Sequence, residues 1–581
     1  MTMTKRVAMV SMVAFLGAVS GGAAMLHHAG YLSLPDALKS RLHAAVHGKD
    51  SKSTYGLLAL PPGGADNLTG IVDEFGQYTK ATWPGKLKDV AELKSRAKDE
   101  LALPSPEGFG DGFDKYGGWL KGPKLKATGF FRTEKVDGRW WFVTPEGHVF
   151  ISVGMDGCNI GNDTIVDASG QDGNGAGAMR RAMFAWLPDQ NDPLAKHYGV
   201  MGAFAGPIKS GKTFDFYAAN LDRKYGPNYE ATWNTVTVAR MRRWGFNTFG
   251  GTATPALTAM HFPYVAKTQV SGKFHHVSAG RAVWGPLPDP FDPAFQTAAH
   301  RALDRWAKRV KGDPYCLGYF VDNEMSWNGR GPTARLGIAI GTLSEDASGS
   351  PAKQEFLSEL KSTYGSIGAL NSAWGTSYAD WSSLEPPVGP FESLTDAQKA
   401  DMSKFVLTFA RRYFSTIHDA LHDVDADHLY LGCRFAAKDE TPDVLQAASE
   451  SCDVISFNIY RDTIDMNDWP EIATVDKPVL VGEFQFTAKD SGLFWGGMNA
   501  AVDQADRGVK YKKYVDSVAD APNFVGCQWF RYYDEPVTGR TWDGENANCG
   551  FVDVTDTPYS DLVNAATEAN RGLYERRLRS R

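Results

Sequence analysis

The chain has 581 residues, 43% of them hydrophobic and 22% charged, and these shares argue against long disorder, a coiled coil and a membrane protein with many spans. Its 61 basic and 68 acidic residues give a net charge of −7, which supplies no electrostatic drive toward nucleic acid or anionic lipid. Aromatic residues make up 12%, which suits a large core or a ligand with flat apolar faces.

The first predicted element is an export signal. Lys5 and Arg6 precede an uncharged run, 7–26, and small residues such as Gly21 and Ala24 follow its most apolar part. This order is typical of a cleaved signal peptide, and an uncleaved membrane anchor is the alternative. Both interpretations place the bulk of the chain outside the cytoplasm, in the periplasm or outside the cell.

Residues 27–125 are rich in loop signals and form a small N-terminal extension in this interpretation. A hairpin follows, in which Asp137-Gly138 supplies the turn between two alternating strands. The six cysteines are widely spaced, so buried thiols are predicted rather than a disulfide framework or a zinc site.

Eight short apolar runs then alternate with stretches of helical periodicity, such as 288–311 and 403–421. The runs are 148–156, 246–251, 264–270, 316–324, 428–435, 453–460, 478–486 and 524–533. Strands that alternate with helices form parallel units, because a parallel neighbour requires a long crossover. The sequence therefore predicts an α/β fold, a (β/α)₈ TIM barrel with long loops over residues 126–575.

Polar side chains cluster at the ends of these runs, where TIM barrels carry their active sites. The predicted substrate-binding residues of this kind are Asp156, Asn159, Asn323, Arg434, Asn458, Tyr460, Arg531, Asp534 and Glu535. Four tryptophans near the same ends, whose faces suit stacking on sugar rings, complete the set: Trp327, Trp495, Trp529 and Trp542. For each tryptophan, packing in the core is the alternative.

Two glutamates, Glu324 and Glu483, each follow an apolar approach on the fourth and seventh strands. A single glutamate at a strand end is equally explained by an ion pair, but two facing carboxyl groups are the requirement of glycoside hydrolysis. Tyr460 on the adjacent strand is placed to hold Glu483 ionised, which favours Glu483 as nucleophile and Glu324 as general acid and base. This retaining mechanism implies carboxyl groups about 5–5.5 Å apart.

Several longer strings carry a resemblance to a known family. Among them are FGQYTKATWPGK (75–86), RWWFVTPEGHVFISVGMD (139–156), DPYCLGYFVDNEMSW (313–327), LVGEFQF (480–486) and WFRYYDEPVTGRTWDGENANCGFVDVTDTPY (529–559). From about residue 70 onward the chain resembles glycoside hydrolase family 50, the β-agarases, within the clan A (β/α)₈ glycosidases. The resemblance implies cleavage of β-1,4 bonds in agarose-type galactans without a cofactor or metal, with Glu324 as acid/base and Glu483 as nucleophile.

The resemblance has one departure and leaves three alternatives. Family members often carry a β-rich domain before the barrel, where this chain has weakly patterned residues. The segment 370–381 resembles family 42 β-galactosidases, which keeps hydrolysis of smaller galactosides open. Residues 206–213 match the phosphate-loop pattern of NTPases, although Pro207 removes a backbone donor that such a loop uses. A carbohydrate-binding barrel without activity is the third alternative, against which the glutamate pair argues.

Overall fold

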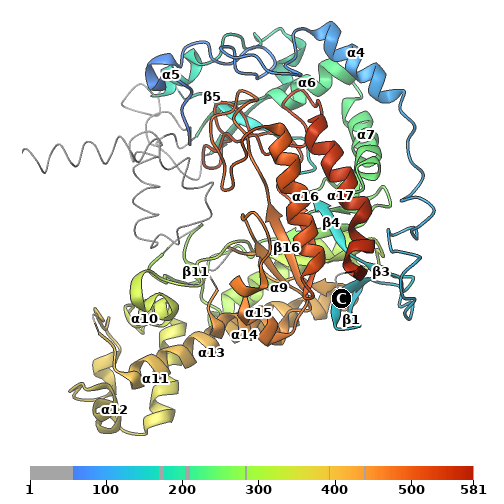
Figure 1. Cartoon of the computed structure of the whole chain (residues 1–581). Coiled ribbons are helices and arrows are strands. Elements are labelled where there is room, and N and C mark those ends of the chain that lie inside the picture. The colour runs from blue at the N-terminus through green and yellow to red at the C-terminus, as the bar shows by residue number, and fades with distance from the viewer. Residues whose placement is uncertain are drawn as a thin grey trace, which may run out of the picture.

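The structure is a computed structural model (Figure 1), and it describes residues 57–168, 176–202, 208, 210–281, 284–391, 393–436 and 440–579. The predicted export segment, 7–26, lies outside these residues. Within the described ranges, no helix is long and apolar enough to cross a membrane.

The central sheet contains all eight predicted strands. They are β4 (Ser152–Met155), β8 (Thr248–Phe249), β9 (Tyr264–Thr268), β12 (Cys316–Val321), the pair β13 (Leu429–Tyr430) and β14 (Phe435–Ala436), β15 (Ile455–Asn458), β16 (Val479–Phe484) and β17 (Phe524–Trp529). Each strand pairs in parallel with its neighbours, and β17 returns to β4. Because β13 and β14 are the two ends of one stretch, 429–436, the sheet curls round into a TIM-barrel-like α/β fold, as predicted.

Helices cover the outside of this sheet. The principal ones are α6 (Phe216–Tyr225), α7 (Tyr229–Arg243), α9 (Pro293–Val310), α13 (Asp396–Val424), α14 (Pro442–Ser451), α16 (Gln504–Asp520) and α17 (Ser560–Arg579). The sequence of α9 shows why it forms, since Asp292 caps its N-terminus, Pro293 takes the first position, and Phe295, Ala299 and Leu303 are buried along one face. The two helices predicted from periodicity are therefore present.

The predicted hairpin is also confirmed. Strands β1 (Arg132–Val136) and β2 (Arg139–Val143) pair antiparallel through Asp137 and Gly138, whose φ angles of 50° and 78° suit a tight hairpin turn. The six cysteines are all buried and unpaired, as expected, which agrees with their positions in or beside apolar strands.

Residues before the hairpin pack closely on the barrel. Leu57 and Ile71 belong to one buried cluster with Phe494 and Val537, which lie in loops after β16 and β17. The helix α4 (Val90–Leu101) lies beside α6 in Figure 1. The division at residue 125 between an extension and a catalytic barrel stays a prediction.

Two insertions extend from the barrel. After β12, the helices α10 (Gly337–Leu343), α11 (Pro351–Tyr364) and α12 (Ile367–Trp374) lie at one end of the long α13 (Figure 1). After β4, an antiparallel sheet forms from β5 (Asp163–Asp167), β7 (Ser210–Asp215) and β6 (Tyr198–Gly202).

The second insertion settles the phosphate-loop alternative. Such a loop opens a helix at its Lys-Ser/Thr end, but Lys212 and Thr213 lie within strand β7 and pair with β6. The ammonium group of Lys212 lies 3.6 Å from the ring centre of Tyr198. Residues 203–207 and 209, which include part of the pattern, lie outside the described residues, but the strand already excludes a phosphate cradle here.

Candidate active site

Glu483 lies near the end of β16, and both of its carboxylate oxygens accept hydrogen bonds. Arg434 donates to one oxygen at 2.6 Å, and the hydroxyl of Tyr460 donates to the other. The residue before Glu483 is a glycine, Gly482, and any larger residue would clash there. A Cβ at this position would lie 2.8 Å from Nε of Arg434 and 2.8 Å from Oδ1 of Asn458. The sequence thus leaves room for two polar side chains beside the carboxylate.

Arg434 is buried and connects Asp156 to Glu483 at the carboxyl ends of the barrel strands. One of its nitrogens donates to Asp156 at 2.9 Å, to the carbonyl of Gly482 at 2.9 Å and to Glu483. Asp156 also accepts from Thr252 and from the backbone of the next residue. Both Arg434 and Asp156 were predicted to bind substrate, but their burial assigns them a different task, which is to position Glu483.

Glu324 follows β12 with a left-handed φ of 50° and has two side-chain donors. The amide of Asn458 donates to one oxygen at 2.7 Å, and the indole of Trp284 donates to the other at 2.8 Å. Asn458 is also the register partner of Glu483. The structure therefore brings Glu324 and Glu483, 159 positions apart in sequence, to one site through Asn458.

Neighbouring charges and burial shift the pKa values of Glu483 and Tyr460. Burial raises the pKa of Glu483, and the negative charge of Glu324 adds to this, whereas Arg434 lowers it. Burial, together with the charges of Glu483 and Glu324, also raises the pKa of Tyr460, so its hydroxyl stays a donor. The positive charges of Arg434 and Lys267, together with the hydrogen bond from Tyr460, therefore favour the ionised form of Glu483.

Sequence reasoning missed Lys267, which lies on β9 and is half-buried. Its pKa is lowered by burial and by Arg434, while Asp156, Glu483 and Glu324 raise it. Gly251 provides space for its aliphatic stem, since a Cβ there would lie 2.7 Å from Cβ of Lys267. A lysine within an apolar strand is the same kind of signal as a glutamate at the end of one, because charged residues are rarely buried without a partner.

The turn that presents Glu324 is held by Asp322, a buried carboxylate with a left-handed φ of 63°. It accepts from the backbone of Val270 at 2.8 Å and from the hydroxyl of Tyr413 on α13 at 2.6 Å. Burial raises its pKa to about 6, although these two hydrogen bonds lower it. Asp322 thus fixes the turn from two sides.

Asp322→Asn is expected to change the pH dependence of stability. Because the pKa is higher in the folded chain, the stabilisation from the protonated carboxyl is complete below about pH 4 and is lost as pH rises through about 6. The variant lacks this titration, so its free energy of unfolding relative to wild type should rise by on the order of 2–3 kcal/mol between these limits. Urea unfolding at acidic and neutral pH measures this difference. The matched change Asp419→Asn on the exposed face of α13 should leave the difference unaltered, and an equal offset for Asp322→Asn at both pH values would contradict the assignment.

Three of the predicted sugar platforms lie in the core. Trp327 is 0% exposed and stacks on Phe414, and Trp529 is 0% exposed and donates to the carbonyl of Cys549. Trp495 is buried against Leu58. These three predictions are corrected, because a buried indole has no face open to a sugar. Trp542, in contrast, is 49% exposed.

Asp534 and Glu535 hold a loop through hydrogen bonds to its backbone. The carboxylate of Asp534 accepts from the backbone of Gly550 at 2.7 Å, and that of Glu535 accepts from the backbone of Ala547 at 2.8 Å. Burial raises the pKa of Asp534 to about 7, whereas Arg507 lowers it. Both residues are buried, so their assignment to substrate is corrected as well.

The remaining predicted residues are partly accessible. Asn323 is half-buried beside Glu324, Asn159 accepts a hydrogen bond from Tyr533 at 2.7 Å, and the guanidinium of Arg531 lies 4.1 Å from the centre of the Tyr533 ring. Their contacts with substrate stay predictions.

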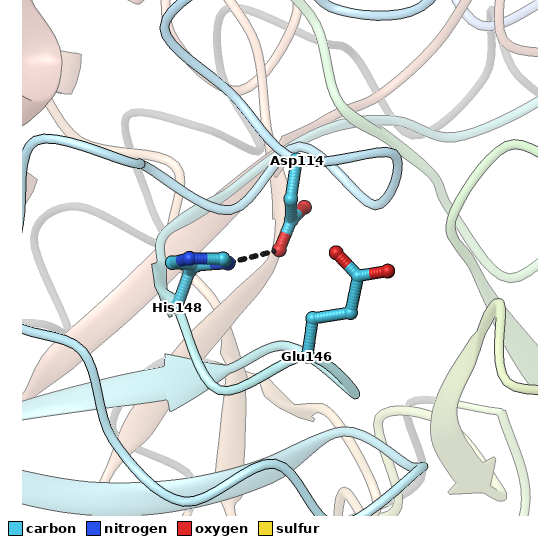
Figure 2. Close-up of side chains that lie close together, drawn as sticks. All are labelled: Asp114, Glu146 and His148. Carbon is cyan, nitrogen blue, oxygen red and sulfur yellow. Dashed lines mark hydrogen bonds and ion pairs between the residues drawn. The ribbon is translucent and has the colours of Figure 1, made fainter.

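Asp114, Glu146 and His148 form a separate cluster, shown in Figure 2, whose potential ligand atoms lie within 4.8 Å of one another. Lysine side chains already occupy its surroundings, since Lys124 lies 3.0 Å from Nε2 of His148 and Lys115 lies 3.4 Å from Glu146. Asp114 is further bonded to the imidazole Nδ1 of His148 at 2.8 Å. The two ammonium groups supply the positive charge that a metal would bring, which favours a structural role.

Comparisons with known proteins place this geometry in context. The sequence model of a family described as Beta-galactosidase matches residues 227–484. Beta-agarase B of Vibrio sp. (strain JT0107) is 41% identical over 528 residues, which cover 88% of this chain and 55% of that protein. Beta-agarase A of the same organism is 38% identical over 525 residues, covering 87% of this chain and 52% of that protein. The chain therefore spans about half the length of these curated relatives.

Solved structures agree with the sequence relatives. The structure of an exo-beta-agarase has a TM-score of 0.85 and 39% identity, and the match covers 89% of this chain and 75% of that chain. The crystal structure of an agarase has a TM-score of 0.83 and 40% identity, with coverage of 88% and 74% respectively.

Proposed function

The chain belongs to glycoside hydrolase family 50, the β-agarases, and from this membership we propose that it hydrolyses β-1,4-galactosidic bonds in agarose-type galactans or their oligosaccharides. The observation that carries the proposal is the pairing of Glu324 and Glu483 through Asn458 at the carboxyl ends of the barrel strands. Two carboxyl groups at this edge of a TIM barrel are what a double displacement requires.

In the first step, a carboxylate oxygen of Glu483 forms a bond to the anomeric carbon while the glycosidic C–O bond breaks. Arg434 and Tyr460 hold Glu483 ionised and fix the direction of its attack. Glu324 gives its proton to the departing oxygen at the same time. The products of this step are a shortened galactan and a glycosyl ester on Glu483.

In the second step, water adds to the anomeric carbon and Glu324 accepts its proton, which releases Glu483 as a carboxylate. Asn458 and Trp284 donate hydrogen bonds to Glu324 and keep its carboxyl group in one orientation through both steps. Lys267 adds positive charge beside the two glutamates and Asp156, which partly balances the negative charge of the site.

A galactosidase acting on small galactosides is the second candidate, and the family match over residues 227–484 favours it. This range includes 370–381, the segment that resembles family 42 in sequence. The two functions differ in the length of the substrate, because a β-galactosidase needs only a terminal galactose whereas an agarase binds several sugar rings.

The test is the digestion of agarose and of defined neoagaro-oligosaccharides by the purified chain, with products separated by length. We expect neoagaro-oligosaccharides from the polymer and faster turnover of these substrates than of an aryl β-galactoside. The anomeric form of the first product, observed by NMR, should match that of the substrate. Turnover of the aryl galactoside alone would favour the second candidate, and an inverted anomer would contradict Glu483 as nucleophile.

A further inference from the structure

Trp284 and Trp542 form an aromatic pair at the edge of the active site. Their ring centres lie 6.3 Å apart with an angle of 49° between the planes. Trp284 comes from the long loop after β9, where it is half-buried and donates to Glu324, and Trp542 comes from the loop after β17. The pair thus leads from the proposed general acid toward the surface.

Trp542 is 49% exposed, and a second exposed apolar side chain lies close to its loop. Its neighbour Thr541 contacts the sulfur of Met201 on strand β6 at 3.9 Å. Met201 is 42% exposed. The loop after β17 and strand β6 thus bring exposed apolar side chains close together, as binding surfaces do.

The loop that carries Trp542 is rigidly held. Arg540 donates to Asp543 at 2.8 and 2.7 Å and lies 2.8 Å from Glu545 and 3.4 Å from Glu535. A fixed aromatic face loses little conformational entropy when it binds, so it stacks on a ligand at low cost. The indole of Trp542 is therefore held in an exposed position by the contacts of its loop.

We propose that Trp284 and Trp542 bind successive sugar rings on the leaving-group side of the cleaved bond. This rests on the proposed function, in which Glu324 protonates the departing oxygen and so must touch the leaving sugar. Because Trp284 donates to Glu324, its ring lies beside that first leaving sugar, and Trp542 lies one step farther out. The substrate class is a galactan chain that extends at least two rings past the cleaved bond, whose apolar C–H faces stack on indole.

The test compares Trp542→Ala with wild type on neoagaro-oligosaccharides of increasing length. In wild type, kcat/KM should rise when the chain becomes long enough to reach Trp542, and in the variant this rise should shrink by about ten-fold, chiefly through KM. Trp542→Tyr keeps an aromatic face and should restore most of the rise. Val509→Ala removes exposed apolar area on α16 and is the matched control, with no change expected.

A binding measurement separates this proposal from the proposed function. In the Glu483→Gln background, which cannot complete the reaction, calorimetry with a neoagaro-hexasaccharide should give a Kd about ten-fold weaker when Trp542 is also Ala. The same Kd with and without Trp542, or an unchanged dependence of kcat/KM on length, would overturn the platform while leaving the proposed function intact. If wild type turns over no neoagaro-oligosaccharide and Glu483→Gln binds none, the proposed function is wrong. The proposed binding of sugar rings by Trp284 and Trp542 is then wrong as well.

Discussion

Replacement of Glu483 by Gln is expected to lower kcat on neoagaro-oligosaccharides by roughly four to six orders of magnitude. Glutamine preserves the size of the side chain and an oxygen for Arg434 or Tyr460, but its neutral amide cannot form the glycosyl ester. Initial rates measure the loss, and circular dichroism shows whether the fold is kept. Glu568→Gln on the exposed face of α17 is the matched control and should retain full activity.

The companion change Glu324→Gln distinguishes the two carboxyl roles. The variant should fail on the polymer, whose leaving oxygen needs a proton, yet keep measurable turnover of an aryl glycoside with an acidic leaving group. Glu483→Gln should lose both activities. Equal residual rates for the two variants on the aryl substrate would contradict the assignment of nucleophile and acid.

Asp556→Ala is expected to destabilise the fold by about 3–5 kcal/mol, because it breaks a buried ion network. The carboxylate of Asp556 accepts from Arg240 at 2.7 Å, from Lys224 at 2.8 Å and from Tyr217 at 3.0 Å. Burial would raise the pKa of Asp556, but Arg240 and Lys224 lower it below its usual value. The left-handed φ of 58° adds to the cost of alanine.

Urea unfolding at neutral pH measures this effect. Asp520→Ala is the control, since its ion pair with Arg576 is 2.6 Å long but both side chains are about 40% exposed. Surface pairs of this kind contribute about 0–1 kcal/mol. A loss of similar size in both variants would show that the Asp556 network does not stabilise the fold as proposed.

The strands, and the positions of Glu324 and Glu483 at the ends of two of them, were predictable because each depends on a local pattern. A buried parallel strand is a continuous apolar run, and a charged residue at its end is conspicuous. The roles of the tryptophans could not be predicted in this way, because a position near a strand end does not reveal which face of the sheet a side chain occupies. Along β17 the side chains alternate, so Gln528 lies against Gly154 of β4 while Trp529 packs between Phe484 and Phe551.

Long-range partners were equally invisible in the sequence. Trp284 lies in a loop with no apolar periodicity, and only the fold brings its indole to Glu324. Arg434 looked like a substrate contact because it lies at the end of a predicted strand, yet its partners Asp156 and Glu483 come from the first and seventh strands of the barrel. Such contacts depend on barrel closure, and closure is a property of the whole chain.

The anchoring of Arg434 has a consequence for how this scaffold changes over evolution or in engineering. The two paired carboxylates are held by side chains of other barrel strands, Arg434 and Asn458, whereas Trp284 and Trp542 are carried by loops. In the proposed mechanism, the strands that hold the two carboxylates are therefore separate from the loop that carries Trp542. Exchange of the loop after β17, which carries Trp542, offers a route to new chain-length preferences, whereas the loop after β9 also carries the Trp284 donor to Glu324.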